Sequence, residues 1–350
     1  MRDVAVISFS QSAVRREAQR NEVEILMPVV QQAVERSGLS RREIGFTCSG
    51  SCDYLAGQSF SFVSAVDALG AWPPISESHV EMDAAWALYE AWVKIQYGAC
   101  DAALVFGFGK SSPGPLRDVL CLQLDPYYVA PLWPDSVSLA ALQARALLES
   151  GKVTEKDLAG VAARSRLDAL QNPHAHLKGE PAVAELLAEP YFVSPLHRHD
   201  CAPISDGAAA VVLAADDVAR RVCERPAWIR GLDHRIETHA LGMRDLTVST
   251  STRLAGRRAG VDRGPVDVAE LHAPFTHQEL ILREALGLGD EVRVNPSGGA
   301  LGANVVMAAG LVRIGEAAGR IHTGDASRAV AHATSGPCLQ QNLVCVLEGS

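Results

Sequence analysis

Hydrophobic and polar residues follow each other along the chain in a pattern that predicts strands and helices in regular succession. Apolar runs bounded by turn residues and helical spacings predict strands at 3–9, 44–48 and 102–108 and helices at 22–37 and 80–96. The strand at 102–108 is continuously apolar, as is typical of a strand buried on both faces of a sheet. This order implies right-handed crossovers in a layered α/β domain.

The same order returns in the second half of the chain. The segments 38–46 and 260–268 share a glycine, an arginine and two apolar strand positions at an offset of 222 residues. The helix that leads to Gly98 corresponds to one that leads to Gly324, at an offset of 226 residues. Nearly equal offsets favour a duplicated α/β unit in which a helix of each half is buried against its counterpart. Chance matching of short apolar segments is the alternative.

The stretch at 295–310, NPSGGALGANVVMAAG, combines a glycine turn with the start of a long apolar segment. Gly298, Gly299 and Gly302 permit close backbone contacts that a Cβ would block, and residues 304–318 predict a buried helix. The N-terminus of such a helix presents unpaired N–H groups and a partial positive charge, which suit an oxyanion or a thioester carbonyl. The stretch is therefore a candidate floor of an active site.

Residues 111–200 belong to neither copy of the repeat. They contain a loop rich in proline and aromatic residues, a helix at 138–149 and a capped helix start at 154–157. An insertion of this length is expected to carry a lid or a substrate wall. It also contains four histidines, His174, His176, His197 and His199. No helix is predicted at these histidines that would fix a carboxylate beside them, so we expect solvated loop histidines rather than metal ligands.

Composition and charge exclude several classes of protein. A chain of 350 residues with 48% hydrophobic residues can fill the cores of two domains. The net charge of -9 and the scattered basic residues argue against nucleic-acid binding. The chain has no leader pattern and no apolar run of membrane-spanning length, so we expect a cytoplasmic protein without a membrane span. The eight cysteines show no disulfide framework, and Cys48 and Cys52 lack a second ligand pair, so no metal site is expected.

Three motifs together resemble the thiolase superfamily, in particular the sterol-carrier-protein type of thiolase-like proteins, also called lipid-transfer proteins. Residues 201–213, CAPISDGAAAVVL, resemble the strand that ends the N-terminal half of a thiolase. Residues 270–276, ELHAPFT, resemble the motif that supplies an oxyanion-hole residue. Residues 295–299 resemble the loop before the helix of the catalytic histidine. The resemblance covers nearly the whole chain, and the combination is specific for the fold.

The resemblance implies an α/β thiolase fold with two duplicated βαβαβαββ halves in five α-β-α-β-α layers. The halves would span 1–222 and 223–350, and 111–200 would be an inserted loop domain that covers an acyl-CoA site. Members of the family pair through an edge strand, so the resemblance also implies a homodimer or a heterodimer.

The chain departs from the family at the three positions that carry its Claisen chemistry. The nucleophilic cysteine is replaced by Glu81, or by Asp83 with a small gap, and neither side chain can form an acyl thioester. The family's histidine on the second buried helix is replaced by Asn304. The position of the second cysteine falls at 335–336, and Cys338 lies two residues too late. Ordinary thiolase activity is therefore not expected.

The resemblance still implies a site that binds an acyl-CoA thioester. The thioester would be the substrate, and no further cofactor is expected. Some cysteine-less lipid-transfer proteins resemble aldol-lyases that cut steroid side-chain CoA thioesters with a small partner of zinc-ribbon and OB-fold type. We therefore favour retro-aldol cleavage of a β-hydroxyacyl-CoA to a ketone and a short acyl-CoA, without a covalent intermediate. The alternatives are a catalytically silent subunit that binds acyl-CoA or scaffolds an active homologue, and residual acyl transfer through Cys338.

His272 is the expected base or oxyanion donor, because neutral imidazole can accept a proton near pH 7 or donate to an enolate. A core histidine bonded to a carbonyl is the alternative. Asp83 or Glu81 is expected as a second acid or base, or as a helix cap. His332 is either a pocket wall or a catalyst, and Asn304 either donates a hydrogen bond or caps the helix it begins. We expect the substrate to contact Phe275, Ser297, Gly298, Gly299 and Gly336.

Overall fold

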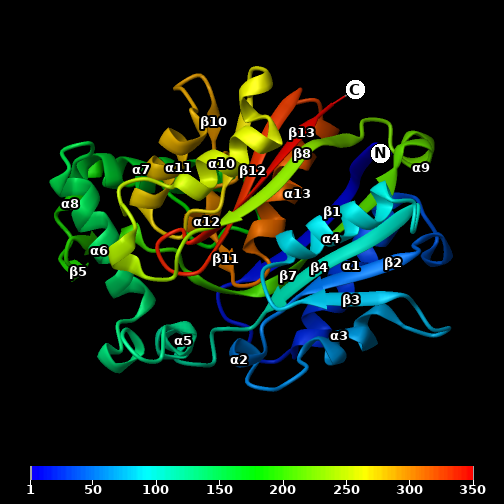
Figure 1. Cartoon of the computed structure of the whole chain (residues 1–350), viewed down its shortest axis with the longest axis horizontal. Coiled ribbons are helices and arrows are strands. Elements are labelled where there is room, and N and C mark those ends of the chain that lie inside the picture. The colour runs from blue at the N-terminus through cyan, green and yellow to red at the C-terminus, as the bar shows by residue number, and fades with distance from the viewer. Residues whose placement is uncertain (1, 350) are drawn as a thin grey trace.

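The computed structural model, which describes residues 2–349, contains one continuous hydrogen-bonded sheet of two halves with matching topology, called here the first and the second sheet (Figure 1). The first sheet consists of β1 (Val4–Val14), β2 (Phe46–Gly50), β3 (Glu77–Val80), β4 (Ala102–Gly109) and β7 (Ile204–Ala215). The second consists of β8 (Ala227–Ile236), β9 (Val268–Leu271), β10 (Arg293–Val294), β12 (Arg328–Ser335) and β13 (Gln341–Glu348). A short pairing of β1 with β8, through Ala5 and Trp228, joins the two sheets.

The strands follow corresponding orders, β3-β2-β4-β7-β1 in the first sheet and β10-β9-β12-β13-β8 in the second. In each sheet the first three strands of that order are parallel and the last two run antiparallel to their neighbours. The short strand β11 (Asn304–Val305) pairs with the start of β7, outside both orders.

Helices form three layers around these sheets, and each layer shares a hydrophobic cluster with the sheet it covers. One outer layer consists of α1 (Glu22–Ser37) and α3 (Phe62–Leu69), and the other of α10 (Thr250–Ala259) and α11 (Thr276–Leu286). The layer between the sheets consists of α4 (Ala84–Gln96) and α13 (Ala309–His322). The five-layered arrangement expected from the resemblance is confirmed.

Four glycines mark the same places in the two halves. Gly38 ends α1 with a φ of 70°, and Gly260 ends α10 with a φ of 85°. Gly98 and Gly324 follow α4 and α13 with φ values of 75° and 77°. All four adopt the left-handed conformation that glycine accepts without strain. The repeat predicted from the two sequence offsets is therefore a repeat of structure.

The inserted segment contains most of the remaining short elements and lies at one end of the molecule (Figure 1). The hairpin and helices of this segment are α5 (Leu116–Leu120), α6 (Ser136–Glu149), α7 (Glu155–Asp168), α8 (Val183–Leu187), β5 (Tyr191–Val193) and β6 (Leu196–His197). The helices predicted at 138–149 and from 154–157 correspond to α6 and α7, and Thr154 forms the expected capping box. The proposed domain boundaries stay a prediction.

The remaining helices are short. They are α2 (Asp53–Ala56), α9 (Asp216–Val222) and α12 (Gly299–Gly302), with single 3-10 turns η1 (Arg41–Glu43), η2 (Cys121–Gln123), η3 (Ala130–Leu132), η4 (Ala169–Gln171), η5 (Arg198–Asp200), η6 (Leu241–Met243) and η7 (Val261–Arg263). Across residues 2–349, none of the helices combines the length and the apolar character that a membrane crossing requires.

Two predicted helices begin later than the sequence pattern indicates. The helix expected at 80–96 begins at Ala84, because 77–80 is the edge strand β3. The helix expected from Asn304 begins at Ala309. Asn304 is drawn into β11 by pairing with Ile204, and Met307, with a φ of 72°, redirects the chain before the helix starts. Asn304 is therefore not the cap of a buried helix.

Candidate active site

The N-termini of the two central helices meet at Asp83, which is 2% exposed. Its Oδ1 accepts the N–H of Ala85 at 2.9 Å and of Leu311 at 3.2 Å, and its Oδ2 accepts the N–H of Gly310 at 2.9 Å. Burial raises the pKa of this carboxyl, while the three N–H groups act in the opposite direction. Since backbone donors occupy both oxygens, the geometry favours a cap shared by two helices over an acid or base.

Small residues allow this close approach. A Cβ on Gly310 would lie 2.6 Å from the Oδ1 of Asp83 and 2.5 Å from the Cβ of Ala333. The N–H of Ala84, at the start of α4, donates to the carbonyl of Met307 at 2.9 Å. The loop before α13 therefore contacts the first turn of α4 through its backbone.

Beside this junction, the side chains of His272 and Asn304 form a pair. The Nε2 of His272 lies 3.2 Å from the Oδ1 of Asn304, and its Nδ1 accepts the N–H of Thr334 at 3.4 Å. Burial lowers the pKa of His272 to about 3, with smaller contributions from His332 and Arg313. The ring is therefore neutral at pH 7, with its proton on Nε2 donating to Asn304. The Nδ2 amide group of Asn304 has no acceptor among the described residues.

The backbone of Asn304 is fixed as well. Its N–H donates to the Oγ of Ser205 at 3.0 Å, and the same Oγ lies 2.7 Å from the Nε2 of His176. Neither Ser205 nor His176 was expected from the sequence as part of the site. The pairing of β11 with β7 brings Ser205 to Asn304, and a hydrogen bond from the N–H of His176 to the carbonyl of Gly302, at 2.9 Å, holds His176 nearby. His176 is half-buried, and burial lowers its pKa, so it differs from the solvated histidine expected there.

Glu81 lies on the loop between β3 and α4 and is exposed. Its carboxylate accepts the N–H of Asp53 at 2.6 Å. Burial raises the pKa of nearby Cys52 to about 11, and Glu81 contributes to that shift. Cys52 and Met307 line a small cavity of about 30 Å³, the size of a single water molecule.

A buried ion pair between Glu270 and Arg313 supports the loop that contains Ser297, Gly298 and Gly299. The Oγ of Ser297 donates to Glu270 at 2.7 Å, and Arg313 contacts the same carboxylate at 2.7 Å. Gly298 has a φ of 89°, and its carbonyl accepts the hydroxyl of Ser165 in α7 at 2.5 Å. Ser297 is buried. The side chain predicted to bind substrate is therefore a support for Gly298 and Gly299, the residues that precede and begin α12.

The side chains of the other predicted site residues form no hydrogen bond with those of His272 and Asn304, although the backbone N–H of His272 donates to the carbonyl of His332 at 3.2 Å. His332 is fully buried and bonds to Asn342 at 3.0 Å, with a pKa that burial lowers to about 4. Phe275 is half-buried, precedes α11 and pairs with Cys201 in an isolated antiparallel β-bridge. Gly336 follows β12 and has a φ of 73°. Cys338 packs in a hydrophobic cluster, and burial raises its pKa to about 11.

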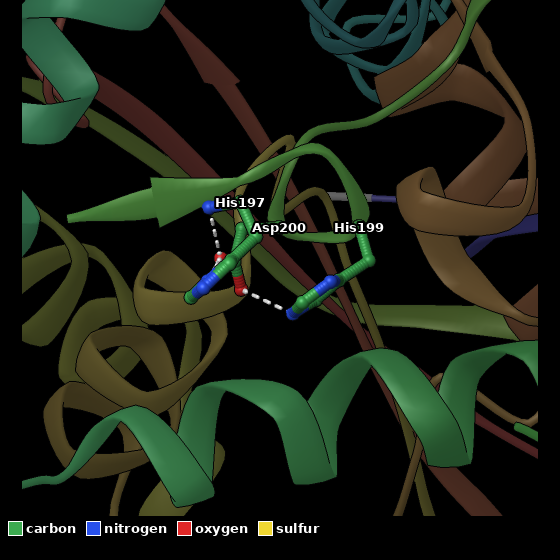
Figure 2. A group of neighbouring side chains, drawn as sticks. All are labelled: His197, His199 and Asp200. Atoms are coloured by element: carbon green, nitrogen blue, oxygen red, sulfur yellow. Dashed lines mark hydrogen bonds and ion pairs between the residues drawn. The ribbon is translucent and has the colours of Figure 1, made fainter. Parts of the chain in front are cut away.

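Two histidines of the inserted segment differ from their sequence interpretation. His197 and His199 are each 4% exposed, and both lie beside the carboxylate of Asp200 (Figure 2). The expectation of solvated loop histidines is wrong for these two residues. Asp200 lies three residues after His197, so the sequence did carry this spacing, whereas Glu189 lies before the hairpin and gave no local signal.

Comparisons with known proteins agree with the fold. No family model matches the chain. The acetyl-CoA acetyltransferase of Methanocaldococcus jannaschii is 26% identical over 349 residues, which cover 90% of this chain and 89% of that protein. The acetyl-CoA acetyltransferase of Methanothermobacter thermautotrophicus is 30% identical over 46% of this chain, a region that spans only 48% of that enzyme. Sterol carrier protein 2 of Bos taurus is 25% identical over 61% of this chain and 46% of its own length.

A solved structure titled "Ltp2-ChsH2(DUF35) aldolase" superposes with a TM-score of 0.82 at 19% identity and covers 99% of this chain and 97% of its own. The chain is thus similar in sequence to thiolases and to sterol carrier protein 2, and it has the thiolase fold. Acetyl-CoA appears in the names of the acetyltransferases, and the comparisons indicate no separate cofactor.

Proposed function

We propose that the chain is an acyl-CoA lyase that cleaves a β-hydroxyacyl-CoA by a retro-aldol reaction. The observation that carries the proposal is the pair of neutral His272 and Asn304 beside the junction of the central helices. In this pair the side chain of Asn304 provides an oriented amide donor at the position where the family has a histidine. Such a donor can stabilise the negative charge of a thioester enolate.

In this reaction a base takes the proton of the β-hydroxyl group, and the Cα–Cβ bond breaks as the C–O bond becomes a carbonyl. The electron pair of the broken bond moves into the thioester as an enolate, which is then protonated at Cα. The products are a ketone and a shortened acyl-CoA, so neither an oxidant nor free CoA is consumed. Asn304 donates from Nδ2 to the thioester oxygen, and His272 is the positioning residue that holds Asn304.

The base is assigned by exclusion. A pKa of about 3 makes His272 a poor proton acceptor at pH 7, and Asp83 is occupied by three backbone donors. Glu81 has an exposed carboxylate on the loop that leads into α4. We assign the removal of the hydroxyl proton to Glu81, which stands where the family has its nucleophile.

Acyl transfer through a cysteine thiolate is disfavoured by the burial of the cysteine side chains. Cys52 and Cys338 have pKa values that burial raises to about 11, so both are thiols at pH 7. A thiolate is the nucleophilic form. The remaining alternative is a silent subunit, which the internal hydrogen bonding of Asp83, Ser297 and His332 favours.

The proposal extends to partners and substrate by similarity. The superposed aldolase is titled as a complex with a DUF35 protein. We propose a small partner of zinc-ribbon and OB-fold type, a homodimer or heterodimer of thiolase-like chains, a cytoplasmic location and a steroid side-chain thioester as substrate. The test is incubation of the purified chain, with and without that partner, with a β-hydroxyacyl-CoA that carries a tertiary alcohol. Ketone release supports the lyase, and its absence in both mixtures favours the silent subunit.

A further inference from the structure

Three buried side chains cluster where the inserted segment ends. His197 closes the β5–β6 hairpin, and His199 and Asp200 lie in the turn η5, just before β7 (Figure 2). The two imidazole rings stack with their centroids 4.9 Å apart and an angle of 10° between their planes. All three side chains are at most 5% exposed. The cluster is distinct from the His272–Asn304 pair.

The carboxylate of Asp200 lies near one nitrogen of each ring. Its Oδ2 is 3.4 Å from the Nδ1 of His197, and its Oδ1 is 3.8 Å from the Nε2 of His199. One ligand atom from each of the three residues lies within 4.8 Å of the others. Asp200 is itself held in place, since it accepts the hydroxyl of Thr276 at 2.6 Å and the backbone N–H of His197 at 2.7 Å.

The Nε2 of His199 has no hydrogen-bond partner among the described residues, although the side chain is only 1% exposed. The other nitrogen of this ring, Nδ1, lies 3.0 Å from the carboxylate of Glu189. When Nδ1 carries the proton toward Glu189, the lone pair of Nε2 faces the carboxylate of Asp200. Two buried acceptors that face each other repel unless a cation lies between them.

We propose that His197, His199 and Asp200 bind a divalent transition-metal ion of the zinc class. Imidazole nitrogens with a carboxylate oxygen form a donor set that zinc prefers. Glu189 would be the outer carboxylate that orients a metal-bound histidine. Ligand atoms around tetrahedral zinc are about 3.3 Å apart, so the separations of 3.4, 3.8 and up to 4.8 Å would have to shorten. The stacked rings would also have to turn so that their lone pairs converge on the ion. Water would fill the fourth position.

The ion would fasten the end of the inserted segment to the second half of the chain. Thr276, which bonds to Asp200, begins α11 four residues after His272. Next to it, Cys201 bridges to Phe275, and the N–H of Ala202 donates to the carbonyl of Pro274 at 2.8 Å. Metal binding would therefore rigidify the turn between β9 and α11. This role does not depend on the proposed lyase activity.

The test measures metal bound to the whole chain, produced without a polyhistidine tag. The protein is incubated with zinc chloride, dialysed, and analysed by elemental mass spectrometry. We expect about one zinc ion per wild-type chain and at least a tenfold lower affinity in His199→Ala. His277→Gln is the matched control, because His277 is also a fully buried histidine but lacks a carboxylate neighbour, and it should bind zinc like the wild type.

Cobalt titration of the wild type gives a second readout that does not depend on the folding of a variant. A tetrahedral site with two imidazoles and a carboxylate should produce the strong visible absorption of four-coordinate cobalt. A wild-type chain that binds neither zinc nor cobalt would overturn the proposal. Equal zinc affinity in wild type and a folded His199→Ala would also overturn it.

Discussion

The carboxylate of Asp83 accepts the backbone N–H of Gly310 at 2.9 Å, so the cap of one central helix also caps the other. The two residues lie 227 positions apart in the sequence. This contact connects the halves of the duplicated fold at the start of both central helices. In this chain the carboxylate of Asp83 stabilises the junction by accepting backbone N–H groups of both helices.

Replacing Asp83 with alanine should strongly destabilise the protein. The change leaves three buried N–H groups without an acceptor and removes the cap of α4, at a cost of about 2–4 kcal/mol in the free energy of unfolding. Chemical denaturation followed by circular dichroism measures it. Thr154→Ala, at the exposed cap of α7, is the control and should cost only about 1 kcal/mol. Equal losses in the two variants would argue against the shared cap.

Gly298→Ala tests the support of the glycine loop. Gly298 has a φ of 89°, and an added Cβ would lie 2.6 Å from the Cβ of Ala169, so we expect a loss of about 2–4 kcal/mol in unfolding free energy. Gly287→Ala is a matched control, because its φ is 65° and nothing lies within 4 Å of an added Cβ. It should cost about 1 kcal/mol, from backbone strain alone. Thermal and urea unfolding of both variants decide between strain and steric clash.

The buried histidines should make the protein unstable in mild acid. Burial lowers the pKa of His277 to about 3, so the unfolded state binds its proton first, at about pH 6.5, as the pH falls. The stability that neutral His277 contributes is present above that pH and is lost progressively down to about pH 3. Between pH 7 and 5 this histidine alone should account for about 2 kcal/mol.

Urea denaturation of His277→Gln at both pH values measures that contribution. The variant should lose about 2 kcal/mol less than the wild type between pH 7 and 5. His239→Gln, the same substitution at an exposed histidine, provides the control for the chemical change itself. An unchanged slope in His277→Gln would show that folding does not lower the pKa of His277.

Asn304→Ala should lower kcat of the proposed lyase by about 10²–10³-fold, the usual effect of losing one oxyanion donor. His272→Ala should act in the same direction through misplacement of Asn304, and the double variant should be less impaired than the product of the two effects. Steady-state kinetics with a tertiary β-hydroxyacyl-CoA measures this. Asn21→Ala, an exposed amide at the cap of α1, should retain the wild-type kcat. If Asn304→Ala were fully active, the assignment would fail.

The features that local sequence determines were predictable. The apolar run at 102–108 became β4, and the repeated glycines Gly38 and Gly260 marked equivalent helix ends. The position of Asn304 was not predictable, because a two-residue strand owes its existence to distant β7. The burial of His199 was not predictable either. Its partner Glu189 lies ten residues earlier, and Thr276, which bonds to neighbouring Asp200, begins the distant helix α11.

The most direct test of the central claim is the stoichiometry of cleavage in the absence of free CoA. The purified chain, alone and with a zinc-ribbon and OB-fold partner, is incubated with a tertiary β-hydroxyacyl-CoA, and products are quantified by mass spectrometry. A retro-aldol lyase releases ketone and shortened acyl-CoA in equal amounts without added CoA. Cleavage that occurs only with added CoA and a β-ketoacyl-CoA substrate, or no cleavage in either mixture, would contradict the account.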